Sequence, residues 1–229
     1  MKIYSIDIET TGVDPKVNNI LTIGAVIADL SDEKLEITNY FNKVFFKKQL
    51  TISSGAYKLN KTLLDWYFEH NEKYFEDLCE KFTYIDYDYV YYENISGTLY
   101  DKLILKNKNS DGKLPNNALI IGKNYDKFDR EFLLTALEHS PSVSPISPLH
   151  RLLNQTSYDI GIACMDLSKD TKIPNTGDCL NRLQIEHNPD ILHHSMYDAY
   201  IMMKMFAKVN GFEIVNKLSD DIFTGYDIN

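Results

Sequence analysis

Two acidic residues, separated by one position, end a hydrophobic stretch at the start of the chain. The stretch is Lys2-Ile-Tyr-Ser-Ile-Asp7-Ile-Glu9-Thr-Thr-Gly12, and its β-favouring residues predict a strand inside a sheet. Side chains alternate between the two faces of a strand, so Asp7 and Glu9 point to the same side. Neighbouring carboxylates repel each other, and hard divalent metals bound by oxygen ligands commonly relieve that repulsion. Alone, such a pair more often marks a solvated sheet edge than a metal site.

A third candidate acid follows another short hydrophobic run. Residues 118–122 predict a buried strand, and Gly122-Lys-Asn124-Tyr-Asp-Lys-Phe128-Asp129 comes directly after it. We predict a helix over 125–139 with Asp129 in its first half, where its carboxylate can face the strand ends that carry the first pair. Asp126 is the local alternative, and either acid could instead lie on a solvated helix surface.

A fourth acid and two histidines open the last long helix, which is predicted over 196–208. The segment is His193-His194-Ser-Met-Tyr197-Asp198. Asp198 would project from the first turns of this helix toward the sheet, and a histidine just before the helix can lean over the same site. The alternative is a surface histidine pair beside an acid that the helix dipole favours.

Together these residues supply a complete set of groups for phosphodiester hydrolysis. Four carboxylates from Asp7, Glu9, Asp129 and Asp198 can hold two Mg²⁺ or Mn²⁺ ions about 3.5–4 Å apart, which position a water and stabilise a leaving 3′ oxygen. A histidine that is neutral near pH 7 can take the proton from that water. This division of labour explains why four acids and one histidine are needed.

The remaining sequence must bring these groups together from distant positions. We predict a mixed α/β domain in which a three-strand antiparallel start is followed by parallel strands, all flanked by helices. Strands are expected over 18–30, 35–46 and 157–163, and helices over 61–82, 94–106 and 180–185. The helix over 61–82 has an expected apolar stripe of Leu64, Tyr67, Phe68, Phe75, Leu78 and Phe82. Loops are expected over 106–117 and 140–148, and a loosely held tail from 220.

Composition limits the function classes. The 229 residues fit a single domain, 1–229, and 44% hydrophobic with 25% charged residues is typical of a globular protein. The net charge of −9 argues against a broad surface that coats nucleic acid, although metal ions and a few lysines could still grip a short stretch. No apolar run is long enough for a membrane span and the start reads directly into a strand, so we expect a soluble, cytoplasmic protein.

These motifs resemble the DnaQ-like family of 3′-to-5′ exonucleases, in the branch with four acids and a histidine. Asp-Ile-Glu-Thr-Thr-Gly at 7–12 matches the family's first motif, and Gly122-x-Asn124-x-x-x-Phe128-Asp129-x-x-Phe-Leu matches the second. The segment 193–199 is similar to the third, with a serine at 195 where alanine is usual. The segment 61–67, which contains the only tryptophan, is similar to the phage exonuclease A type and related bacterial exoribonucleases.

The resemblance implies an RNase H-like fold, two Mg²⁺ ions with Mn²⁺ as a substitute, and release of nucleoside 5′-monophosphates from a nucleic-acid 3′ end. Single-stranded DNA is the favoured partner, with RNA as the alternative, because no motif shows how the site treats a 2′-hydroxyl. A non-catalytic nucleic-acid-binding module is the other class of function, and the filled catalytic positions speak against it. The oligomeric state is open, and a homodimer is compatible with the sequence.

The resemblance also implies which histidine acts. The family's histidine lies five residues before its acid, which selects His193. His194 lies four residues before Asp198, the spacing of a sister branch that uses tyrosine, but Tyr197 is adjacent to the acid and cannot take that tyrosine's place. Asp159 is similar to an acidic position common in relatives, and we expect a structural role for it.

Substrate contacts are implied more loosely. By resemblance, the backbone at Thr10 and Thr11 holds the terminal nucleotide, and Asn124 of the second motif lies beside it. Phe128 and Trp66 could stack on a base. Both aromatic residues fit core packing as an alternative, and this alternative is stronger for Phe128.

Overall fold

A mixed sheet carries the first acidic pair. The computed structural model describes residues 1–108 and 118–223. Within these ranges the strands are β1 (Lys2–Thr10), β2 (Ile20–Ser31), β3 (Lys34–Val44), β4 (Ala118–Gly122), β5 (Ser157–Asp159) and β6 (Glu213–Val215). They pair in the order β5-β4-β1-β2-β3-β6. The contacts of β1 with β2 and of β2 with β3 are antiparallel, whereas β4 is parallel to β1 and β5 is parallel to β4. The predicted antiparallel start and parallel continuation are therefore confirmed.

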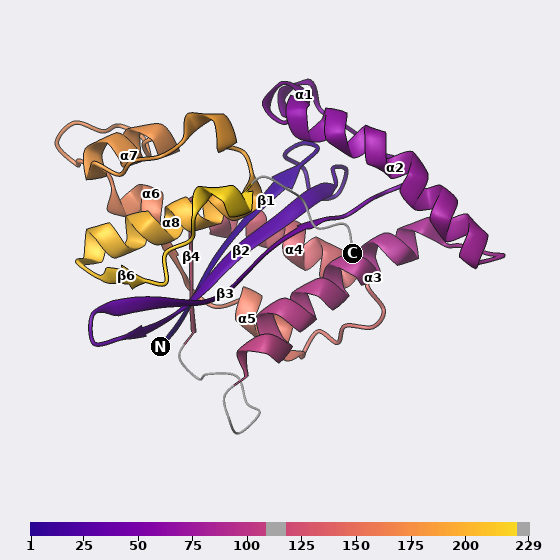
Figure 1. The fold of residues 1–229 in the computed structure, drawn as a ribbon, viewed down its shortest axis with the longest axis horizontal. Coiled ribbons are helices and arrows are strands. Elements are labelled where there is room, and N and C mark those ends of the chain that lie inside the picture. The colour runs from indigo at the N-terminus through magenta and orange to yellow at the C-terminus, as the bar shows by residue number, and fades with distance from the viewer. Residues whose placement is uncertain (109–117, 224–229) are drawn as a thin grey trace.

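Helices cover both faces of this sheet (Figure 1). Their bounds are α1 (Ser54–Leu59), α2 (Lys61–Lys81), α3 (Tyr87–Leu99), α4 (Asp129–Glu138), α5 (Pro148–Leu153), α6 (Ile160–Ala163), α7 (Thr176–Leu183) and α8 (Ser195–Asn210). One hydrophobic core joins the sheet to α3, α4 and α5. A second core joins the other face to α6, α7 and α8. A third, smaller core packs α2 against the ends of β2 and β3.

The alternation of β1 decides which face carries the acids. Ile6 and Ile8 belong to the core beside α3 and α4, whereas Ile3 belongs to the core beside α8. Because strand side chains have a period of two, Asp7 and Glu9 share the face of Ile3. The acidic pair therefore points toward the layer that contains α8.

The long helix α2 confirms the prediction for 61–82 to within one residue, but its expected apolar stripe is wrong at two positions. Phe68 is 49% exposed and Phe82 is 58% exposed. The buried residues are Leu63, Leu64, Tyr67 and Phe75. Only this narrow face meets the ends of β2 and β3, so the opposite side of the helix remains in solvent.

One predicted strand ends earlier than expected, and one predicted helix begins later. The strand predicted over 157–163 stops at Asp159, because the carboxylate of Asp159 accepts a hydrogen bond from the backbone N–H of Ile162 (3.2 Å) and starts α6. The helix predicted over 125–139 is a 3₁₀ turn followed by α4, which begins only at Asp129. The prediction missed α1 and α5. The helix predicted over 94–106 instead begins at Tyr87 as α3 and continues through π and 3₁₀ turns to Asn107.

The C-terminal part of the described chain is more ordered than expected. After α8, Gly211 adopts a left-handed conformation (φ 73°) and leads into β6, which pairs parallel with β3. This strand was not predicted. In the stretch 220–223, at the start of the expected loose tail, the ring of Phe223 is buried against Tyr197 and Tyr200. The remaining tail, 224–229, and most of the predicted polar loop, 109–117, lie outside the described residues.

Among the helices that the structure describes, none combines the length and the apolar character needed to span a bilayer.

Gly24 of β2 allows α8 to approach the acidic face of the sheet. It is the cross-strand partner of Asp7. A Cβ atom at this position would lie 2.0 Å from the backbone nitrogen of Met196, in the first turn of α8. The absence of a side chain here therefore permits close contact between the helix start and the strand.

We expect Gly24→Ala to destabilise the protein by about 1–3 kcal/mol, because the new methyl group must push the start of α8 away from β2. Urea unfolding followed by circular dichroism measures this change. The matched control is Gly97→Ala in the interior of α3, where an added Cβ meets nothing within 4 Å. The free energy of unfolding of this control should rise by roughly 0.5–1 kcal/mol, because alanine has a better helix propensity than glycine. Equal stabilities for the two variants would contradict the contact at Gly24.

Candidate active site

An open cleft of about 440 Å³ lies at the end of β1. Its lining includes all five residues predicted to be catalytic: Asp7, Glu9, Asp129, His193 and Asp198. They come from three separate elements, since β1 carries the first pair, α4 begins with the third acid, and α8 and the turn before it carry the last two groups. The sequence motifs therefore meet in one place.

Asp129 reaches the central strand from the first residue of α4. Its Oδ1 accepts a hydrogen bond from the backbone N–H of Ile8 (3.2 Å), between the two acids of β1. The side chain is buried at 6% exposure. Asp126, the alternative from the sequence, instead forms an ion pair with Arg130 at 2.6 Å and lines a different hollow. The structure therefore places Asp129, rather than Asp126, beside the acidic pair.

The start of α8 is seated on a row of three strand residues. Asp7, Gly24 and Asn42 are cross-strand neighbours on β1, β2 and β3. The hydroxyl of Ser195 donates to Oδ1 of Asn42 at 3.0 Å, and the amide nitrogen of Asn42 lies 3.1 Å from the imidazole Nε2 of His194. Gly24 allows the start of α8 to approach the sheet closely, and the hydrogen bond to Asn42 holds it there. As a result, Asp198 is held near Asp7.

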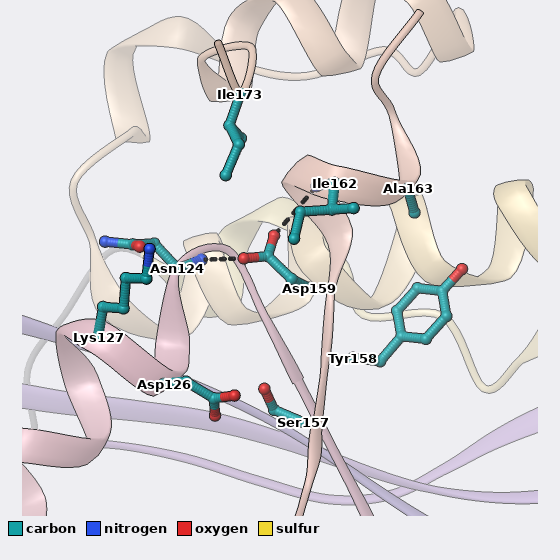
Figure 2. A pocket seen from close by; sticks show the side chains of 9 residues that line it. All are labelled: Asn124, Asp126, Lys127, Ser157, Tyr158, Asp159, Ile162, Ala163 and Ile173. Atoms are coloured by element: carbon teal, nitrogen blue, oxygen red, sulfur yellow. Dashed lines mark hydrogen bonds between the residues drawn. The ribbon is translucent and has the colours of Figure 1, made fainter. Parts of the chain in front are cut away.

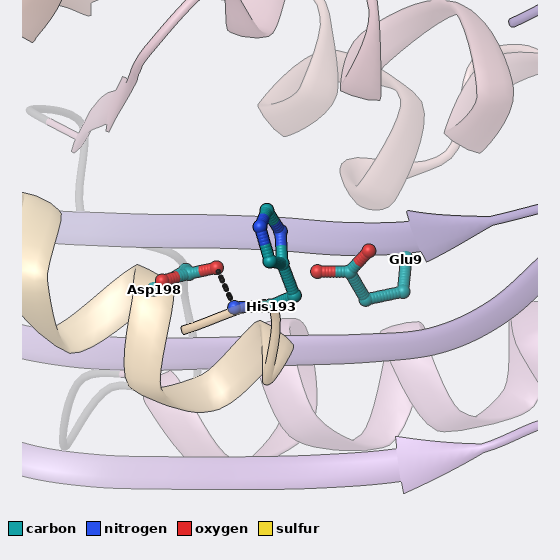
Figure 3. A group of neighbouring side chains, drawn as sticks. All are labelled: Glu9, His193 and Asp198. Carbon is teal, nitrogen blue, oxygen red and sulfur yellow. Dashed lines mark hydrogen bonds between the residues drawn. The ribbon is translucent and has the colours of Figure 1, made fainter. Parts of the chain in front are cut away.

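The two histidines have different surroundings. His193 has a left-handed backbone (φ 68°), and its backbone N–H donates to Oδ2 of Asp198 at 3.0 Å. Its ring stands between the carboxylates of Glu9 and Asp198 (Figure 3). His194 is buried, and its Nδ1 accepts from the backbone N–H of Tyr197 as the cap of α8. The geometry thus directs His193 into the cleft and gives His194 a structural contact.

Burial and mutual repulsion favour the protonated forms of the acids. Burial, followed by the charges of the other acids, raises the pKa values of Asp7 and Glu9 well above their usual range. Burial also raises the pKa values of Asp129 and Asp198 to about 7, even though backbone hydrogen bonds oppose the rise. Partial burial lowers the pKa of His193, so its imidazole is neutral at pH 7.

This donor set fits a hard divalent cation. Glu9, His193 and Asp198 each offer a ligand atom, and those atoms lie within 4.8 Å of one another. Oδ1 of Asp198 is buried and has no hydrogen-bond partner among the described residues. Buried carboxylates without compensating cations are costly, and Mg²⁺ and Mn²⁺ prefer oxygen ligands. The cleft is therefore chemically suited to hold such ions.

The predicted substrate-binding residues divide into two groups. Thr10, Asn124 and Phe128 line the cleft together with the acids. Among the described lining residues, neither Thr11 nor Trp66 is found. Thr11 is fully buried, and its hydroxyl accepts from the backbone N–H of residue 19. The ring of Trp66 stacks against those of residues 46 and 70 within the small core beside α2.

A second hollow of about 470 Å³ adjoins the cleft through Asn124 (Figure 2). It lies where β4 and β5 end. Asp159 accepts there from the backbone N–H groups of Asn124 and Ile162, both at 3.2 Å. These bonds hold the left-handed turn at Asn124 (φ 62°), in agreement with the structural role expected for Asp159.

Sequence reasoning missed three residues that shape the cleft: Gly24, Asn42 and Asn60. A glycine inside a strand pattern is a recognisable sign of close backbone approach. The two asparagines carried no usable signal. Asn42 lies within a predicted strand, and Asn60 precedes a predicted helix, where asparagine ordinarily serves as a cap.

No family model matches the chain, and no curated protein matches it. Solved structures of Exonuclease I do match its fold. The E. coli enzyme in complex with a dT13 oligonucleotide has a TM-score of 0.57 and 16% identity, over 91% of this chain and 41% of that chain. The zinc-bound E. coli complex with single-stranded DNA has a TM-score of 0.57 and 15% identity, over 92% and 40%. A further Exonuclease I structure has a TM-score of 0.58 and 15% identity, over 92% and 41%.

These likenesses confirm the predicted fold class. The chain has an RNase H-like mixed sheet flanked by helices, as in Exonuclease I. It spans about 41% of the length of that protein.

The raised pKa values of the acids predict how stability depends on pH without metal. Asp129 and Asp198 bind protons up to about pH 7 in the folded state but only to about pH 4 when unfolded. The contribution of these two carboxyls to stability should therefore be greatest near pH 4, fall as the pH rises from about 4 to about 7, and level off above 7. The free energy of unfolding of Asp129→Asn should exceed that of the unaltered protein by at least about 1 kcal/mol at pH 8, with little difference near pH 4. Urea unfolding in EDTA measures the stability of the two proteins at each pH.

The control is Glu80→Gln on the exposed face of α2, which should follow the unaltered protein at every pH. Addition of Mg²⁺ at pH 8 should stabilise the unaltered protein, because the ion binds only the folded site. A wild-type stability at pH 8 equal to that of Asp129→Asn, in EDTA, would contradict the electrostatic account.

Proposed function

We propose that this chain is a metal-dependent 3′-to-5′ exonuclease that removes nucleoside 5′-monophosphates from a single-stranded 3′ end. The observation that carries the proposal is the meeting of four carboxylates and one neutral imidazole in a single open cleft. They are the five groups that the resemblance to the DnaQ-like family selects by position. The likeness to Exonuclease I supports the same proposal through the fold.

In this proposal each group has a defined task. Asp7, Glu9, Asp129 and Asp198 would hold two Mg²⁺ ions, with Mn²⁺ as a substitute. When bound, such ions lower the pKa of water and neutralise the charge that develops on the leaving 3′ oxygen. His193 takes the proton of the attacking water, because its lowered pKa leaves a ring nitrogen free to accept it. The oxygen of that water forms a bond to phosphorus as the P–O3′ bond breaks, so the released nucleotide carries the 5′-phosphate. The 3′ oxygen of the shortened strand takes up a proton from solvent water and becomes a hydroxyl.

The other cleft residues suit a terminal nucleotide. Thr10, Asn124 and Phe128 lie in the same lining as the acids, so the backbone, an amide and an aromatic ring can contact sugar, phosphate and base. We favour DNA, because the Exonuclease I structures of matching fold contain dT13 and other single-stranded DNA. RNA is the second candidate on the sequence resemblance. We propose that Trp66 supports the fold instead of stacking on a base.

Removal of a cleft carboxylate should abolish cleavage without unfolding the protein. We expect Asp7→Ala and Asp198→Asn to lower the rate of mononucleotide release by at least about 100-fold, since each removes a charged group that stabilises the transition state. Both should keep the unaltered circular dichroism spectrum, and lower repulsion should raise their stability in EDTA. The rate is measured on a labelled single-stranded oligonucleotide with Mg²⁺.

Asp126→Asn is the matched control, because Asp126 lies three residues before Asp129 and outside the cleft lining. It should cleave within about threefold of the unaltered rate, as expected for the loss of a partly exposed ion pair. Wild-type cleavage by Asp7→Ala would show that the active site has been assigned incorrectly.

Matched DNA and RNA oligonucleotides, each with a free or a blocked 3′ end, test two points. They show whether cleavage starts at the 3′ end and whether the site prefers deoxyribose or ribose. We expect stepwise release of mononucleotides from free DNA ends, slower release from RNA, and no release from blocked ends or in EDTA. The physical reason is that the cleft must accommodate the terminal 3′ residue beside the acids.

Three outcomes would revise the proposal in different ways. Faster release from RNA would identify an exoribonuclease. Cleavage of oligonucleotides with blocked 3′ ends would contradict the assignment as a 3′-to-5′ exonuclease. Binding of the oligonucleotide without metal-dependent cleavage would point to a non-catalytic nucleic-acid-binding module.

A further inference from the structure

Asn60 joins the helical hairpin of α1 and α2 to the acidic end of β1. It is 4% exposed and lines the cleft. Its amide Nδ2 donates to the backbone carbonyl of Thr10, 50 residues away in sequence, at 3.1 Å. Glu9 lines the same cleft, where burial raises the pKa of its carboxyl and the neighbouring amide of Asn60 acts against that rise. These contacts fall where the ladder between β1 and β2 is interrupted, between Glu9 and Thr10.

The neighbours of Asn60 determine how its amide is turned. The carbonyl of Thr10 can only accept a hydrogen bond, so the NH₂ end of the Asn60 amide faces it. Oδ1 is then left buried without a hydrogen-bond partner among the described residues. An orphaned buried acceptor opposes folding. The fold therefore tolerates an unfavourable buried oxygen at the position where the Asn60 amide donates to the end of β1.

Asn60 also forgoes its usual structural use. It occupies the N-cap position of α2, where asparagine commonly accepts a backbone N–H of the first turn. Here the side chain makes no capping hydrogen bond. The amide is directed to the cleft instead of to the helix that it begins.

Helix α1 forms one wall of the cleft, and its position depends on contacts with the end of β1. No residue of α1 is buried, so apolar packing does not hold this short helix in place. Hydrogen bonds flank it instead: the N–H of Ser53 donates to the carbonyl of Thr11 at 2.8 Å, and Asn60 reaches Thr10 at the other end. Ala56 of α1 belongs to the cleft lining.

We propose that Asn60 is a positioning residue, whose amide fixes the Glu9 carboxylate as a metal ligand and ties the α1 wall to the end of β1. The inference rests on the metal-binding role proposed for Glu9. A donor that orients a ligand carboxylate restricts the directions in which its oxygens can bind an ion. Loss of such a donor typically weakens metal affinity 10–100-fold.

Titration calorimetry with Mn²⁺ tests this role directly on the full chain, starting from metal-free protein. Asn60→Leu keeps the approximate volume and removes the amide, and Asn60→Ala removes the side chain beyond Cβ. We expect both to bind Mn²⁺ about 10–100-fold more weakly. The Mn²⁺ concentration for half-maximal oligonucleotide cleavage should rise by the same factor.

Asn107→Ala is the matched control. Asn107 is also buried, at 3% exposure, and its Nδ2 also donates to backbone carbonyls, those of Lys102 and Leu103. It does not belong to the described lining of the cleft. Its loss should reduce stability and leave Mn²⁺ affinity within twofold of the unaltered value.

The outcomes separate this inference from the proposed function. Mn²⁺ affinity within twofold of the unaltered protein in a folded Asn60 variant would overturn the positioning role, as would an equal loss in Asn107→Ala. If Leu and Ala both prevent folding, Asn60→Ser is measured by the same criterion. If the unaltered protein binds Mn²⁺ but cleaves no oligonucleotide, the nuclease proposal fails while calorimetry still decides the role of Asn60. If the unaltered protein binds no Mn²⁺, both fail.

Discussion

Mutual repulsion among four carboxylates is the constraint on which the rest of this site depends. Asp7 and Glu9 share one strand face, and Asp129 and Asp198 are brought against them from two helices. Burial raises all four pKa values, and the charges of the other acids raise those of Asp7 and Glu9 further. Backbone N–H groups of Ile8 and His193 offset part of this energy, and a divalent cation would offset far more. The metal-free fold thus carries a local instability that binding can relieve.

The fold gathers the acids by supporting each contributing element separately. The row formed by Asp7, Gly24 and Asn42 seats the start of α8. The turn at Asn124, held by Asp159, precedes the start of α4. Asn60 secures the far wall. The cleft is therefore an assembly whose geometry depends on polar contacts between elements as much as on the hydrophobic cores behind them.

Fold and site contribute different kinds of support to the proposed function. The likeness to Exonuclease I concerns the backbone, at 15–16% identity, and a shared fold does not determine chemistry. The chemical argument comes from Asp129, His193 and Asp198, which the structure places beside the acids of β1. The resemblance to the DnaQ-like family selects the same three residues by their position in its motifs, so the sequence resemblance and the structure point to one cleft.

The sequence by itself determined the features that depend on local periodicity and spacing. The period of two in β1 placed Asp7 and Glu9 on one face, and the antiparallel start and α2 followed from hydrophobic patterns. The roles of Gly24, Asn42 and Asn60 were decided only by the tertiary structure, because their partners lie on other elements and local patterns do not encode such contacts. For the same reason the packing of Trp66, the short strand β6 and the burial of Phe223 were not predicted. Polar contacts between distant segments complete the site that the local sequence began.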